Sequence, residues 1–168
     1  RSEVPPDVSE AIMAAHEAIQ REMGPDVRVS LRSSALGEDM AGTSFAGQYR
    51  SELNVSAEHI LHAYKEILAS KYSLAATSYR LNRGIRDEDV SMSVGCMAMV
   101  NAACGGVMYS RNPVDIRDNS VIINSVWGLP KSVVDGSVTP DLFVVSRDDP
   151  GKIIERDIQV KELKFVCY

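Results

Sequence analysis

The 168-residue chain lacks the features that would place it in a membrane or on a nucleic acid. No apolar run approaches the roughly 20 residues that a membrane-spanning helix needs, and no charged-then-apolar secretory signal opens the sequence. The net charge is -5, which argues against a general nucleic-acid-binding surface. We therefore expect a cytoplasmic protein without membrane or nucleic-acid partners.

Cysteine is scarce, and several familiar catalytic patterns are missing. Cys96, Cys104 and Cys167 include no closely spaced pair of the kind that binds a metal, so we expect reduced thiols that serve as small core residues. His59 and His62 are three residues apart but have no third ligand nearby, so they do not predict a metal site. There is no Ser/His/Asp set, zinc pattern or Rossmann fingerprint.

The spacing of apolar residues predicts an α/β (α+β) fold, with a long helix packed on a mainly antiparallel sheet. Helical spacing indicates an N-terminal helical segment within residues 1–25, which Gly24-Pro25 ends, and one long helix over 57–82. Period-two segments separated by turn residues indicate the strands. The expected strands are residues 27–32, 52–55, 90–100, 106–110, 120–124, 142–147, 153–160 and 164–168. We expect the sheet to be built largely from the strands within residues 90–168.

The most informative segment is a predicted strand that ends in an arginine and leads into a glycine-punctuated loop. Residues 29–39 read VSLRSSALGED, and residues 43–48 read TSFAGQ. Arg32 supplies a permanent charge and a planar fork of donors, and Arg28 and Arg50 could complete a cluster of cations. This pattern fits phosphate or nucleotide binding and also fits an ordinary strand-to-loop turn.

The same segments resemble the ATP-binding part of phosphoenolpyruvate synthases (pyruvate, water dikinases), pyruvate phosphate dikinases and rifampicin phosphotransferases. The resemblance begins with LRSSA, ED and SFAGQ, at residues 31–35, 38–39 and 44–48. It continues with SVG at 93–95, GVMYS at 106–110, WGL at 127–129 and TPD at 139–141. These motifs occur in the family's order, and together they cover residues 26–168, which we take as one truncated nucleotide-binding region.

The resemblance implies part of an ATP-grasp fold, with ATP and Mg²⁺ as cofactors. By resemblance, Arg32 contacts the ATP phosphates, and Gly47 and Ser51 touch phosphate through a backbone group and a hydroxyl. The loop 35–48 would close over the nucleotide, with Phe45 as its anchor. The remaining implied contacts, to adenine, come from the strand that carries Met97, Met99 and Val100.

Two motifs depart from the family pattern. Met97 and Ala98 stand where relatives commonly have glutamine and lysine, so a backbone contact to adenine could survive but side-chain hydrogen bonds could not. Pro130 and Lys131 replace the glycine and glutamate of a Gly-Leu-Gly-Glu loop. Lys131 could bind phosphate or be a solvated loop lysine, and Asp135 is equally open.

The resemblance implies the ATP-binding part of a phosphoenolpyruvate synthase-like phosphotransferase. Such an enzyme uses ATP and Mg²⁺ to phosphorylate a histidine on a separate mobile domain, which carries the phosphate to a pyruvate-binding domain. We expect no catalytic residue and no metal ligand in this fragment, because the family's nucleotide lysine and metal ligands lie in other stretches. The alternative is a degenerate ATP-grasp module that acts as a non-catalytic interaction domain, so whether the fragment is itself part of an active enzyme stays open.

Overall fold

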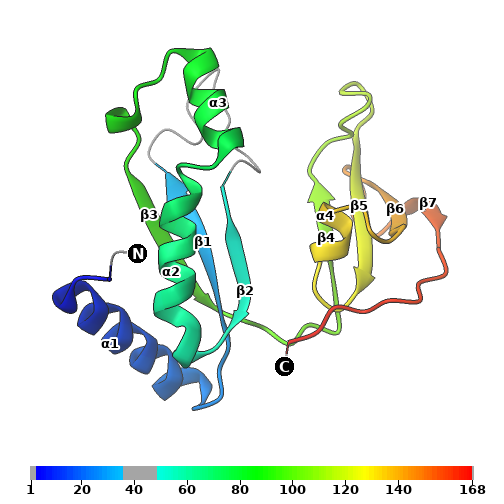
Figure 1. Cartoon of the computed structure of the whole chain (residues 1–168). Helices are drawn as coiled ribbons and strands as arrows, with labels where there is room; N and C mark the ends of the chain where they lie inside the picture. Colours follow the sequence, from blue (N-terminus) through cyan, green and yellow to red (C-terminus); the bar gives the residue numbers. More distant parts are fainter. Residues whose placement is uncertain (1–2, 36–48, 168) are drawn as a thin grey trace. The chain divides into compact units, whose positions relative to one another are not determined.

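The computed structural model describes residues 3–35 and 49–167. The chain forms two compact units, Arg1–Met99 and Val100–Tyr168, each with its own antiparallel sheet (Figure 1). Mixed helices and antiparallel strands confirm the expected fold class. None of the helices in the described part of the chain is long and apolar enough to cross a membrane.

The first unit is a three-stranded sheet with helices on one face. Its strands are β1 (Val29–Ala35), β2 (Ser51–Val55) and β3 (Met92–Ala98), in the order β2-β1-β3. Helix α2 (Ile60–Ser70) packs across the sheet (Figure 1), and α1 (Pro6–Met23) adds Ile12, Met13 and Ile19 to the same core. The buried residues of that core are Val29, Leu31, Val55, Ile60, Ala63 and Ile67.

The single helix expected over residues 57–82 is wrong, because the chain breaks after the last turn of α2. A short 3₁₀ turn (Ala57–His59) leads into α2, and α3 (Leu74–Arg83) starts separately. Ser73 is extended (φ -61°, ψ 154°), and its hydroxyl accepts the N–H of Ala76 at 3.2 Å, as a helix N-cap does. The buried Arg80 donates to the Lys71 carbonyl at 2.6 Å, which holds the break in place.

The second unit is a four-stranded meander. Its strands are β4 (Cys104–Tyr109), β5 (Ser120–Trp127), β6 (Asp141–Ser146) and β7 (Ile153–Asp157), in that order, with the short helix α4 (Lys131–Val134) after β5. Two expectations are wrong here. The predicted strand 90–100 is β3, which pairs with β1 instead of the later strands. In the predicted strand 164–168, the described residues 164–167 form a single isolated parallel bridge, between Phe165 and Gly128, and no strand.

The expectation that the cysteines are core residues is also wrong. Cys96 and Cys104 are exposed, and Cys167 is half-buried. Cys96 lies on β3, which is an edge strand of the three-stranded sheet, and Cys104 begins β4, an edge strand of the other sheet. Edge positions have neighbours on one side only, which the local sequence pattern does not reveal.

His16 is a buried polar residue of the first unit. Its side chain is 1% exposed, and neither ring nitrogen has a hydrogen-bond partner in the described part of the chain. It borders a mainly apolar groove of about 440 Å³ between α1, α2 and the sheet, together with Ile12, Leu31 and Tyr64. An unsatisfied buried polar group costs about 1–3 kcal/mol, so His16 should lower the stability of this unit.

We therefore expect His16→Leu to raise the free energy of unfolding by about 1–3 kcal/mol, because leucine has a similar volume and needs no partner. The measurement is urea denaturation, read as a higher midpoint at an unchanged slope. His62→Leu is the control, because His62 is exposed on α2 and should change stability by less than about 0.5 kcal/mol. A loss of stability in His16→Leu would mean that the imidazole is satisfied by a hydrogen bond.

Candidate functional site

The two faces of the three-stranded sheet differ in character. Leu31 points to the helix side, where it belongs to the core with Ile60 and Ile67 of α2. Side chains alternate along a strand, so the next residue, Arg32, lies on the opposite side, and it is exposed. We call that opposite side the open face, because no helix of the first unit packs on it among the described residues.

Arg32 stands in the middle of a row that crosses the open face. Its partner on β2 is Ser51, and its partner on β3 is Gly95. Directly paired residues of an antiparallel sheet have Cβ atoms about 4.5–5.5 Å apart on the same face. The register therefore brings the two predicted phosphate contacts, Arg32 and Ser51, side by side.

Ser51 reaches the open face only because β2 contains a bulge. Val55 pairs with Val29 on the helix side, and strict alternation back along β2 would place Ser51 there too. The register instead shifts, so that Glu52 pairs with Leu31 on the helix side. Asn54 adopts φ 59° within the shifted stretch, a left-handed conformation that asparagine tolerates better than most residues.

The surroundings of Arg32 suit an anion. Ser34 pairs with Ser93 at one end of the open face, and Ser30 pairs with Met97 at the other. None of the described β1, β2 and β3 residues on this face is acidic, so the charge of Arg32 is not offset there. A Cβ added at Gly95 would meet only the Arg32 carbonyl, at 3.9 Å, which leaves room for a ligand beside the guanidinium.

The predicted adenine contacts lie at the end of β3. Met97 is exposed on the open face, and Val100 is exposed as the first residue of the second unit. The backbone N–H of Met99 donates to the Arg28 carbonyl at 2.8 Å, so it faces β1. In an antiparallel pair alternate residues face away from the partner strand, so at this end of β3 the backbone groups of Ala98 point outward.

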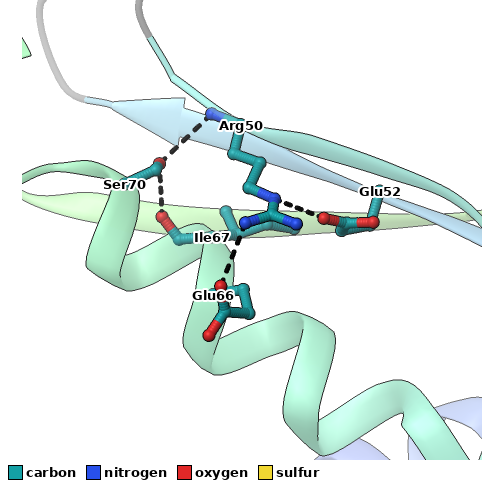
Figure 2. A network of polar contacts seen from close by, with 5 residues as sticks. All are labelled: Arg50, Glu52, Glu66, Ile67 and Ser70. Carbon is teal, nitrogen blue, oxygen red and sulfur yellow. Dashed lines mark hydrogen bonds and ion pairs between the residues drawn. The ribbon is translucent and has the colours of Figure 1, made fainter. Parts of the chain in front are cut away.

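The expected cluster of Arg28, Arg32 and Arg50 does not form on the open face. The Arg50 guanidinium lies on the helix side, where Nη1 is 3.0 Å from Glu66 Oε2 of α2 and Nε contacts Glu52 (Figure 2). Arg28 lines a cavity of about 290 Å³ that Arg50 and Glu66 also border. Of the three arginines, only Arg32 is placed on the open face by the strand register.

Lys131, in the second unit, is engaged by its own helix. Its Nζ lies 2.7 Å from Asp135 Oδ2, one helical turn away, and 5.3 Å from the centre of the Phe165 ring. The hydrogen bond from Lys131, followed by one from Ser137, lowers the pKa of Asp135 to about 2. Both of the residues that the sequence left open, Lys131 and Asp135, thus meet in one exposed ion pair.

Comparison with known proteins identifies the family of this chain. The family model described as "Pyruvate phosphate dikinase, AMP/ATP-binding domain" matches residues 1–168. The chain belongs to this family. The chain is 36% identical over 166 residues to a protein named phosphoenolpyruvate synthase from Pyrococcus furiosus, covering 98% of the chain and 20% of that relative. It is 38% identical over 167 residues to a probable phosphoenolpyruvate synthase from Staphylothermus marinus, covering 97% of the chain and 20% of the relative.

The chain thus spans about a fifth of the length of these relatives. The resemblance predicted from the motifs is confirmed. The roles of individual residues stay predictions, including those of Arg32, Ser51, Met97, Met99 and Val100. Gly47, Phe45 and the loop over 36–48 lie outside the described residues.

Proposed function

We propose that this chain is the ATP-binding part of a phosphoenolpyruvate synthase-like phosphotransferase and that the phosphates of ATP bind on the open face. The observation that carries the proposal is the row formed by Ser51, Arg32 and Gly95. The row offers one permanent positive charge, one hydroxyl and an unfilled space beside them. The family match indicates that the ligand is an adenine nucleotide.

Each residue of the row has a distinct role in this proposal. Arg32 can donate two parallel hydrogen bonds to phosphate oxygens and offset their negative charge. The Ser51 hydroxyl donates a further hydrogen bond to phosphate. Gly95 has no side chain to occupy the space that the phosphate needs. Catalysis of phosphoryl transfer rests largely on such positioning and charge stabilisation.

Magnesium does not fit this face by itself. Mg²⁺ prefers carboxylate and water oxygens, and the described strand residues of the open face include no carboxylate. The described residues also include no group of three or more His, Cys, Asp or Glu side chains that could hold a metal. The proposed role of this chain is therefore to bind and orient ATP, and we propose, from the family resemblance, that the metal ligands lie in other parts of a longer protein.

For that longer protein we propose the reaction that the family resemblance implies. ATP phosphorylates a histidine on a mobile domain, and that domain carries the phosphate to a pyruvate-binding domain. The cytoplasm is the proposed location. The competing proposal is a non-catalytic interaction domain. It is supported by four residues that depart from the family pattern: Met97, Ala98, Pro130 and Lys131. ATP binding separates the two roles, because only the first requires it.

The proposal is tested by a substitution whose side chain fills the space beside Arg32. We expect Gly95→Leu to weaken ATP binding by the full-length protein at least about tenfold, which corresponds to 1.4 kcal/mol, because leucine would occupy the phosphate position. Gly95→Ala is the control, since its Cβ meets only one atom, at 3.9 Å. Calorimetric titration with ATP measures both, and thermal unfolding checks that both variants fold.

Two results would count against the proposal. If Gly95→Leu binds ATP as the unmodified protein does, the phosphates lie away from the open face. If the unmodified protein itself binds no ATP in the presence of Mg²⁺, the interaction-domain role is the better account.

A further inference from the structure

A network of polar contacts ties the start of β2 to the last turns of α2. The Arg50 backbone N–H donates to Ser70 Oγ at 3.2 Å, and the Ser70 hydroxyl donates to the Ile67 carbonyl at 2.6 Å. The Arg50 side chain reaches Glu66 of α2 at 3.0 Å and also contacts Glu52 of β2 (Figure 2). Arg50 is therefore held to the helix through both its backbone and its side chain.

The network includes the residues directly before and after Ser51 in the chain. Arg50 and Glu52, on either side of Ser51, both have side chains on the helix side, as Figure 2 shows for the pair and Glu66. Ser51 itself pairs with Arg32 on the open face. Fixing the residues before and after Ser51 fixes the direction of the Ser51 side chain, because successive side chains of a strand point to opposite faces.

We propose that Arg50 is a positioning residue that holds Ser51 beside Arg32 and thereby sets the affinity of the open face for phosphate. This inference rests on the proposed function of that face. Arg50 acts through the backbone of β2 and makes no contact with the ligand. Glu66 is part of the same positioning network, because its carboxylate on α2 forms an ion pair with the Arg50 guanidinium.

The direction in which Glu66→Gln changes the affinity for ATP separates this positioning role from a direct electrostatic role of Arg50. If Arg50 attracted phosphate through its charge, removing the nearby negative charge in Glu66→Gln would strengthen ATP binding. If Arg50 positions Ser51, Glu66→Gln removes an anchor and weakens ATP binding. Arg50→Gln should weaken binding in the positioning case as well, so the two variants should change affinity in the same direction.

The experiment is calorimetric titration of the full-length protein with ATP and Mg²⁺. We expect Arg50→Gln and Glu66→Gln each to weaken binding by about three- to tenfold, which lies in the lower part of the range of coupling energies within one polar network. Arg86→Gln is the matched control, since Arg86 is an exposed arginine of the same unit that pairs with Glu88 and Asp89, and it should leave the affinity unchanged. Exposed ion pairs contribute little to stability, so the unfolding temperature should hardly move.

A double-mutant cycle completes the test. In a Ser51→Ala background, Arg50→Gln should cause no further loss of affinity, because its effect passes through the Ser51 hydroxyl. Additive losses, stronger binding by Glu66→Gln, or unchanged binding by Arg50→Gln while Gly95→Leu still weakens it would each overturn the inference and leave the proposed function standing. Absence of ATP binding in the unmodified protein would overturn the proposed function, and this inference with it.

Discussion

Replacing Arg32 with alanine is expected to weaken ATP binding by the full-length protein about tenfold to 150-fold. A hydrogen bond to a charged group is worth about 1.5–3 kcal/mol, and Arg32 is the cation that the register places at the centre of the open face. Arg32→Lys should give an intermediate loss, since it keeps the charge and loses the planar fork. Titration calorimetry gives all three affinities.

Arg21→Ala is a suitable control for this experiment. Arg21 is an exposed residue in the last turn of α1, a helix on the other side of the sheet, so its removal should leave ATP affinity unchanged. An Arg32→Ala protein with unaltered affinity would show that Arg32 is not a phosphate contact. We expect the 168-residue chain on its own to bind ATP weakly or not at all, because the resemblance implies that the nucleotide lysine and the metal ligands lie in other stretches.

The local pattern predicted most elements but not how they associate. The strands β1 and β2 and the helix α1 followed from alternation and from Gly24-Pro25. The break before α3 did not follow, because apolar spacing continues across Tyr72 while the N-cap at Ser73 depends on a single hydroxyl. β3 pairs with β1, which is distant in sequence, and both strands pack against α2. The spacing of apolar residues within β3 does not reveal which strand it pairs with.

The candidate site shows the same division. Arg32 could be predicted from its residue type and its place in a strand. The separation of Arg32 from Arg50 could not, because it depends on the register shift in β2 and on the pairing of Arg50 with Glu66. A one-residue shift moves side chains to the other face of a sheet, so nearness in sequence is a poor guide to a shared surface. The register shift in β2, where Asn54 has φ 59°, thus decides that Ser51 and not Glu52 shares the open face with Arg32.

The second unit depends on close backbone contacts at Gly128, which follows Trp127 in the WGL motif. The Gly128 N–H donates to the Ala103 carbonyl at 2.9 Å, and Leu129 N–H donates to the Phe165 carbonyl at 2.8 Å. Gly128 has φ +74°, and a Cβ at this position would lie 1.9 Å from the Phe165 carbonyl oxygen. Only glycine permits both the left-handed backbone and this approach of the C-terminal segment.

Gly128→Ala should therefore destabilise the second unit by about 2–5 kcal/mol, the sum of about 1–2 for the left-handed backbone and about 1–3 for overpacking. Gly136→Ala is the matched control: φ is +70° there, but no atom lies within 4 Å of the added Cβ, so only the backbone cost should appear. Urea unfolding followed by the fluorescence of Trp127, the single tryptophan, measures both variants. Equal losses in the two would mean that the Phe165 segment does not dock against Gly128, whereas a larger loss in Gly128→Ala would measure the energy of that docking.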